Sequence, residues 1–286
     1  MSIAALTSNG MELPQSLRYF SPLRESRLSM FADGSAQARF AEDGYLMLRG
    51  ALPADTVVNV REAYFRLFDP RVLKNGDARR GEFSGYLPVG LPPHGTAGHP
   101  AHTFVRSEQF IAFRQLPVFR AISEALLGSP AKVVWRTPLR HFIRGSNTAS
   151  RAHLDRTYLN CSIGSCVTIW VPLGDCPLQA GGLLYLEKSH ERPAVEALAR
   201  AFGPIDRADR RPLTHDLKWL ADATGRRWLG ADCDAGDVIV HSPTVVHAST
   251  DPMIDHMRVS TDIRFLREDA PDDPRWQRDW AADDGY

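Results

Sequence analysis

The stretch Arg151-Ala-His-Leu-Asp-Arg-Thr-Tyr-Leu-Asn160 holds the residues around which the rest of the chain is arranged. Side chains two positions apart in an extended strand point to the same face, so His153 and Asp155 can aim at one point. Together they would supply half of a metal site. The best candidate for a third ligand lies far downstream, at His247. Two histidines and one carboxylate leave metal positions open on the opposite side, which suits non-heme Fe(II).

A cation follows the second part of this pattern. Arg258 opens the strand-like run Arg258-Val-Ser-Thr-Asp-Ile-Arg-Phe-Leu266. A guanidinium beside an iron site can hold the far carboxylate of a diacid that chelates the metal at its other end. In this run, Arg258, Ser260, Asp262 and Arg264 alternate with Val259, Thr261, Ile263 and Phe265. One face of the strand is therefore polar, which fits either a cavity wall or a solvent-facing surface.

Taken in order, these residues resemble the phytanoyl-CoA dioxygenase family of Fe(II)/2-oxoglutarate-dependent oxygenases. The resemblance runs from roughly residue 37 to 267, and three further segments carry it: Phe40–Gly50, Thr168–Leu173 and Gly181–His190. The last departs from the family at Glu187-Lys188, where Pro-Gly is usual. The resemblance implies a mainly β protein with flanking helices, built as a double-stranded β-helix (a jelly-roll, cupin-like barrel). It also implies Fe(II), 2-oxoglutarate as cosubstrate, and O2.

The resemblance assigns roles to particular positions. His153, Asp155 and His247 would be the catalytic iron ligands. Arg258 would hold the distal carboxylate of 2-oxoglutarate. Ser249 is expected to add a hydrogen bond, because it lies two residues from His247 on the same face of a strand. Trp170 would border the same pocket, with a place in the core as its alternative.

Two alternatives at the metal bear on the chemistry. His241 follows Val-Ile-Val in a predicted strand and is the rival third ligand, but the family pattern places the ligand directly before Ala248-Ser249. Related halogenases have Ala or Gly at the carboxylate position, which leaves room for chloride. Asp155 therefore favours hydroxylation or a desaturation-type oxidation over halogenation.

The substrate is less well defined by the sequence. Arg140, His141 and Tyr158 lie near the metal motif along the chain and are the substrate-binding candidates. A small molecule of amino-acid or secondary metabolism is expected. Two other functions remain open: a cupin-type metal-dependent isomerase or hydrolase, and a non-catalytic binding protein of the same fold. Arg258 argues against the former, and the intact ligand set argues against the latter.

Composition limits the partners and the location. The 34 basic and 34 acidic residues give a net charge of zero, so no general attraction to nucleic acid or anionic membrane is expected. No segment approaches the ~20 apolar residues of a membrane span, and the first residues lack the features of a signal peptide. We expect a cytoplasmic protein whose four cysteines, Cys161, Cys166, Cys176 and Cys233, are reduced.

The chain divides into a short extension and one large domain. Residues 1–35 read as an N-terminal arm, and residues 36–286 as the dioxygenase domain. The Gly- and Pro-rich segment 69–105 is a candidate lid loop, and 191–230 an insert over the barrel mouth. A helix is expected over 35–43, ended by Gly44, and Pro117 is expected to divide the helical segment 107–127 into two helices.

Overall fold

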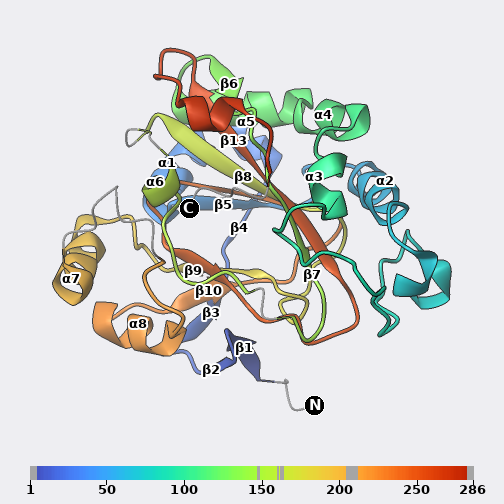
Figure 1. The fold of residues 1–286 in the computed structure, drawn as a ribbon. Coiled ribbons are helices and arrows are strands. Elements are labelled where there is room, and N and C mark those ends of the chain that lie inside the picture. The colour runs from blue at the N-terminus through green and yellow to red at the C-terminus, as the bar shows by residue number, and fades with distance from the viewer. Residues whose placement is uncertain (1–4, 147–148, 160, 162–163, 204–211, 282–286) are drawn as a thin grey trace.

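The computed structural model describes residues 5–146, 149–159, 161, 164–203 and 212–281, and within them two β-sheets carry the architecture. In Figure 1 the larger sheet crosses the centre of the molecule and the smaller one lies below it. The order in the larger sheet is β4 (Glu25–Ser26), β5 (Tyr45–Leu48), β11 (Val238–His241), β8 (Cys166–Pro172), β13 (Arg258–Arg267) and β6 (Ala131–Val133), with β7 (Leu139–Phe142) also paired to β13. The order in the smaller sheet is β12 (His247–Ser249), β9 (Leu183–Leu186), β10 (Trp228–Gly230) and β3 (Phe20–Pro22).

Helices cover the outer faces of these sheets (Figure 1). The helices are α1 (Ser35–Asp43), α2 (Ala54–Phe65), α3 (Pro100–Phe104), α4 (Glu108–Arg114), α5 (Pro117–Leu127), α6 (Asp155–Tyr158), α7 (Arg192–Phe202) and α8 (Leu217–Thr224). Short 3-10 turns are η1 (Leu28–Phe31), η2 (Pro70–Val72), η3 (Lys74–Gly76) and η4 (Pro274–Gln277). The mainly β fold with flanking helices is confirmed. Gly44 ends α1 in a left-handed conformation, and Pro117 begins α5 after α4, as expected from the sequence.

The apolar core is divided by the sheets into layers. The largest cluster joins α1, α2, α4 and α5 to the outer face of the larger sheet. A second joins α7 and α8 to the outer face of the smaller sheet. A third lies between the sheets and includes Trp170, Tyr185 and Ile239. Two sheets that enclose a shared interior make the jelly-roll arrangement, and the space between them is where inward-facing polar side chains can meet.

The N-terminal segment is built into both sheets. β3 pairs with β10 and β4 pairs with β5, while β1 (Leu6–Ser8) and β2 (Met11–Leu13) form a separate hairpin. Leu6, Leu13 and Leu23 are buried. The described part of the 191–230 segment likewise supplies a sheet strand, β10, as well as the helices that cover that sheet. Whether residues 69–105 act as a lid stays a prediction.

The cysteines differ in part from expectation. Cys161 and Cys166 are joined by a disulfide, with Cα atoms 6.4 Å apart, so the prediction of four reduced thiols is wrong for this pair. They lie five positions apart in the sequence, so a short closed loop joins them. Cys176 and Cys233 are free and buried. In the described part of the chain, no helix is both long enough and apolar enough to cross a membrane.

Candidate metal centre

Two distant segments meet as one antiparallel bridge. The backbone N–H of His153 donates to the carbonyl of His247, and the N–H of His247 donates to the carbonyl of His153, each at 3.0 Å. Residues directly opposite each other in such a pair place their side chains on the same face. The two imidazole rings lie 4.2 Å apart, centroid to centroid. Backbone pairing therefore positions two nitrogen ligands that are far apart in the sequence.

The carboxylate of Asp155 reaches the two histidines because the backbone changes conformation beside it. Leu154 is extended, with φ −117° and ψ 129°, so Asp155 returns to the side of His153. Asp155 then begins the one-turn helix α6, whereas the sequence predicted a strand continuing through the motif. One ligand atom from each of His153, Asp155 and His247 lies within 4.8 Å of the others. This is the 2-His-1-carboxylate set of non-heme iron sites, and the three predicted ligands are brought together.

Hydrogen bonds determine which nitrogen of each histidine faces the centre. Nδ1 of His153 lies 2.7 Å from the carbonyl of Arg151, and Nδ1 of His247 lies 3.1 Å from that of Val245. A carbonyl only accepts, so each Nδ1 carries the proton and each Nε2 keeps its lone pair for a metal. Burial lowers the pKa of His153 and holds the pKa of His247 well below its usual range. Both rings are therefore neutral and able to ligate near neutral pH.

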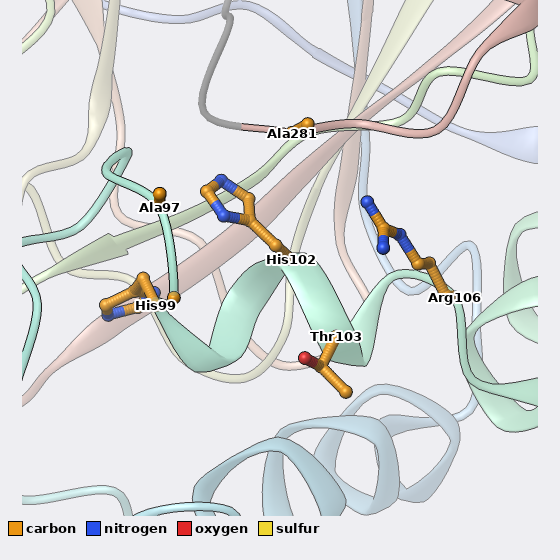
Figure 2. A pocket seen from close by; sticks show the side chains of 7 residues that line it. Ala97, His99, His102, Thr103, Arg106 and Ala281 are labelled. Atoms are coloured by element: carbon orange, nitrogen blue, oxygen red, sulfur yellow. The ribbon is translucent and has the colours of Figure 1, made fainter.

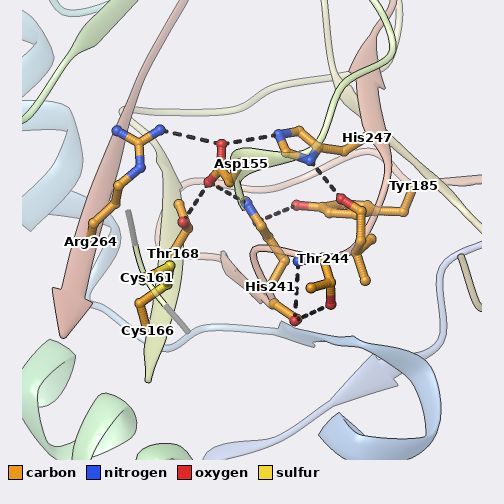
Figure 3. Close-up of polar contacts among 11 residues, drawn as sticks. Asp155, Cys161, Cys166, Thr168, Tyr185, His241, Thr244, His247 and Arg264 are labelled. Carbon is orange, nitrogen blue, oxygen red and sulfur yellow. Dashed lines mark hydrogen bonds and ion pairs between the residues drawn. A yellow bond between two sulfur atoms is a disulfide. The ribbon is translucent and has the colours of Figure 1, made fainter. Parts of the chain in front are cut away.

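The carboxylate of Asp155 has different partners on its two oxygens (Figure 3). Oδ2 accepts from the Thr168 hydroxyl at 2.6 Å and from Nε2 of His241 at 3.3 Å. Oδ1 lies 3.4 Å from a guanidinium nitrogen of Arg264 and 3.8 Å from Nε2 of His247. Burial alone would raise the pKa of Asp155, but Arg264, His241 and His247 together hold it well below its usual range. The group is an anion whose Oδ1 lies toward Nε2 of His247.

His241 is thus a contact of the ligand carboxylate. It lies at the end of β11, and its Nδ1 is 3.0 Å from the Tyr185 hydroxyl. The sequence raised His241 as the rival third ligand, but its Nε2 is directed at Asp155, while His247 shares the ligand cluster with His153. Thr168 and Arg264 were not predicted to touch Asp155. The alternating polar face of the last strand was the only sequence signal for Arg264, and Thr168 offered none.

The predicted cosubstrate cation lies on the interior face of the larger sheet. Arg258 is opposite Phe142 in the register of β13 and β7, and its guanidinium carbon is 4.0 Å from the centre of that ring. Its Nε and Nη2 donate to the Ser260 hydroxyl at 3.0 and 2.8 Å, and its Nη1 donates to the Gly181 carbonyl. Burial lowers the pKa of Arg258 to about 10, which leaves the side chain a cation at neutral pH.

Trp170 and Ser249 lie on the same interior. The ring of Trp170 is 5.5 Å from the guanidinium carbon of Arg258. Its Nε1 is buried and has no hydrogen-bond partner among the described residues. A buried N–H donor without a partner is costly unless a ligand supplies an acceptor. Ser249 follows His247 by two residues on β12, and its hydroxyl oxygen accepts from the Ser150 N–H at 2.7 Å. The roles of both at the cosubstrate stay predictions.

The three substrate candidates are separated by the fold. Arg140 pairs with Ser260 across β7 and β13, so it shares the face of Arg258. His141 points to the opposite face, where its Nδ1 is 3.0 Å from the Tyr64 hydroxyl and its ring packs among aromatic side chains. The structure does not bring His141 to the metal centre, because neighbouring residues of a strand alternate between faces. The side chain of Tyr158 lies outside the described part.

Sequence reasoning noted Asp262 but gave it no role. Asp262 pairs with Trp170 across β13 and β8 and is partly exposed in the middle of an otherwise buried stretch of strand. Its negative charge opposes the effect of burial on the pKa values of His153 and Arg258, so it faces the same interior. A surface pocket of about 560 Å³ lies elsewhere, beside α3 (Figure 2). It is lined by Ala97, Gly98, His99, His102, Thr103, Arg106 and Ala281, none of them a ligand.

Solved structures share this fold. The epimerase SnoN, in complex with Fe3+, alpha ketoglutarate and nogalamycin RO, is 21% identical, with a TM-score of 0.57 and coverage of 85% of this chain and 87% of that one. The carbocyclase SnoK from nogalamycin biosynthesis is 20% identical, with a TM-score of 0.58 and coverage of 84% and 86%. EvdO2 from Micromonospora carbonacea var. aurantiaca, complexed with 2-oxoglutarate, is 17% identical, with a TM-score of 0.54 and coverage of 85% and 96%.

The sequence itself gives the family. No curated protein matches the chain. The family described as Phytanoyl-CoA dioxygenase (PhyH) matches residues 40–259, a range that includes all three ligand residues and Arg258. The match covers well over half of the 286 residues and agrees with the jelly-roll architecture and the His–Asp–His cluster. The chain belongs to the phytanoyl-CoA dioxygenase (PhyH) family.

Proposed function

We propose that this protein is a non-heme Fe(II)/2-oxoglutarate-dependent oxygenase that oxidises a small molecule. The observation that carries the proposal is the convergence of His153, Asp155 and His247 to within 4.8 Å. Arg258 on the same interior supports it, because a buried cation held by neutral partners suits a cosubstrate carboxylate. When bound, iron with 2-oxoglutarate and O2 supplies the oxidising power, and succinate and CO2 are released.

The chain's own residues bind, orient and exclude water. The two imidazoles of His153 and His247 and a carboxylate oxygen of Asp155 would hold the metal and leave positions for other ligands. Arg258 and Ser260 orient the far end of the cosubstrate, and Trp170 offers its unpartnered N–H toward the same space. The apolar side chains between the sheets limit access of water. A carboxylate at Asp155, where halogenases leave an open position, favours hydroxylation or another oxidation over chlorination.

Asp262 supports a substrate with a hydrogen-bond donor. It faces the interior and is partly exposed, and its carboxylate accepts no hydrogen bond from the residues that the structure describes. An ionised carboxylate can only accept, so a hydroxyl or ammonium group of the substrate would satisfy it. SnoN and SnoK come from nogalamycin biosynthesis. For this chain we accordingly propose a polar small molecule of secondary metabolism.

An anaerobic titration tests the proposal. Fe(II) is added to the protein, then 2-oxoglutarate, and the visible metal-to-ligand charge-transfer band is recorded. We expect a band in the wild type and none in His153→Ala. In Arg258→Ala, the band should appear only at higher concentrations of 2-oxoglutarate. A folded, iron-loaded wild type without a band would overturn the 2-oxoglutarate assignment and favour a cupin-type isomerase or hydrolase.

A further inference from the structure

A chain of side chains leads from the ligand carboxylate across the interior. Oδ2 of Asp155 contacts Nε2 of His241 at 3.3 Å, and Nδ1 of His241 contacts the Tyr185 hydroxyl at 3.0 Å. The ring of Tyr185 stacks on Tyr45 with centroids 5.5 Å apart and planes 19° from parallel. The Tyr45 hydroxyl in turn accepts from the Arg24 N–H at 3.0 Å. Residues of α6, β11, β9 and β5 thereby hold one imidazole in a single orientation.

The contacts fix which ring nitrogen of His241 faces the metal ligand. The ionised carboxylate of Asp155 can only accept, so Nε2 of His241 carries a proton and donates to Oδ2. Nδ1 on the other side of the ring shares a 3.0 Å hydrogen bond with the Tyr185 hydroxyl. Tyr185 therefore holds the ring with Nε2 directed at Asp155.

The donation leaves the two carboxylate oxygens unequal. Oδ2 already accepts from the Thr168 hydroxyl at 2.6 Å, and His241 is its second donor. Oδ1 is the oxygen nearer Nε2 of His247, and its only described polar contacts are His247 and Arg264. A six-coordinate metal held by one atom each of His153, Asp155 and His247 would have positions left for a 2-oxo acid and for O2. A carboxylate that bound through both oxygens would occupy one of these positions.

We propose that His241, oriented by Tyr185, is a positioning residue that restricts Asp155 to one-oxygen coordination and so keeps the O2 position open. The inference rests on the proposed metal centre and adds to it a function for two residues outside the ligand cluster. Residues that orient ligands in this way commonly change metal affinity ten- to hundredfold when removed.

The chain contains a matched control. Tyr64 and His141 form a second buried Tyr–His pair, also 3.0 Å from hydroxyl to Nδ1, on the opposite face of the larger sheet. Nε2 of His141 lies against the sulfur of Met257, so this pair reaches no metal ligand. Loss of either pair removes the same chemical contact from an equally buried place, but only His241 is connected to Asp155.

The test measures metal binding by apo-protein in the absence of substrate. Co(II) is titrated into wild type, His241→Leu, His241→Gln, Tyr185→Phe, His141→Leu and Tyr64→Phe, and its affinity and visible spectrum are recorded; circular dichroism confirms folding. Co(II) absorbs more weakly as its coordination number rises. We expect His241→Leu to weaken Co(II) binding about ten- to hundredfold and to lower the absorption per bound ion. His241→Gln, which keeps an N–H donor, should recover part of both, and Tyr185→Phe should lie between.

Subsequent addition of 2-oxoglutarate to the Fe(II)-loaded proteins separates the two proposals. A missing charge-transfer band in wild type would count against the proposed function, while the Co(II) comparison would still report on His241. Equal Co(II) affinity and spectra in wild type and folded His241→Leu would overturn the inference. So would equal changes in His141→Leu, since these would show an effect of packing alone. If His241→Leu does not fold, His241→Gln and Tyr185→Phe decide by the same criteria.

Discussion

The guanidinium carbon of Arg258 lies 4.0 Å from the centre of the Phe142 ring, so this buried cation rests on an aromatic face. Its described hydrogen bonds go to a hydroxyl and a carbonyl, both uncharged acceptors, and none goes to a carboxylate. A buried charge with neutral partners is costly, and an incoming carboxylate would reduce that cost. This geometry supports the proposal that Arg258 holds the distal carboxylate of 2-oxoglutarate.

Replacement of Arg258 should weaken binding of 2-oxoglutarate. Arg258→Ala is expected to raise the 2-oxoglutarate dissociation constant about a hundredfold, because a charge-assisted contact of ~2–3 kcal/mol is lost. Arg258→Lys should recover part of it, since it keeps the charge without the planar fork. Calorimetric titration of the Mn(II)-loaded protein measures both constants. Unchanged affinity in Arg258→Ala would place the distal carboxylate elsewhere.

Gly181 should be intolerant of any side chain. Its φ is +102°, and a Cβ built there would lie 2.6 Å from a ring carbon of Phe142, the ring that supports Arg258. Gly181→Ala is therefore expected to strain the backbone and displace that ring, with a cost of about 1–3 kcal/mol in unfolding free energy. Urea unfolding measures this cost. Gly145→Ala is the control, because its φ is also positive but no atom lies within 4 Å of its Cβ position.

Trp170→Phe should weaken ligand binding while leaving the stability of the apo-protein nearly unchanged. The indole N–H has no described partner, so its removal costs the apo-protein no described hydrogen bond and leaves most of the packing in place. We expect thermal stability of the apo-protein to change little, while binding of 2-oxoglutarate or substrate weakens about tenfold through loss of one donor. Equal binding by the variant would assign Trp170 to the core alone.

Metal should stabilise the folded chain through His153. At a metal concentration one hundred times the dissociation constant, binding adds about 2.7 kcal/mol to the unfolding free energy. Scanning calorimetry with and without Mn(II) should show a rise of several degrees in the wild type and none in His153→Ala. His190→Ala serves as the control, because His190 contacts the Ala41 carbonyl and is not in the ligand cluster. An equal rise in His153→Ala would contradict the assignment.

Three histidines beside α3 and β7, two of them buried and one half-buried, should make the apo-protein sensitive to acid. Burial lowers the pKa of His94 to about 3 and that of His99 to about 4, and holds that of His141 well below its usual range. The unfolded chain takes up protons at these positions below about pH 6.5, whereas the folded chain does not. Stability should therefore fall as pH falls from 6.5 toward 4.5, by about 1.4 kcal/mol per pH unit for each histidine.

Urea unfolding of the apo-protein across that pH range measures the slope. His99→Asn keeps a side-chain acceptor for the Ala101 N–H but cannot be protonated. The unfolding free energy of His99→Asn should fall less steeply with pH than that of the wild type, by the contribution of about one histidine. An unchanged slope would show that His99 is protonated in the folded state.

The sequence by itself determined the residue types of the centre and the class of fold. The His153–Asp155 spacing, His247 and Arg258 predicted a candidate ligand set and a cation, because these depend on local geometry and on donor chemistry. Short apolar runs broken by turns predicted a mainly β protein, and Gly44 and Pro117 marked helix ends, because backbone conformation at glycine and proline is a local property.

Only the tertiary structure decided which side chains meet. Strand pairing places His247 opposite His153, and sheet register turns Arg140 inward and His141 outward. No local pattern predicts that Thr168, His241 and Arg264 converge on Asp155, since they come from three strands whose order is set by pairing. The N-terminal strands and β10 likewise enter sheets through partners distant in the sequence. Register and pairing depend on the whole buried interior.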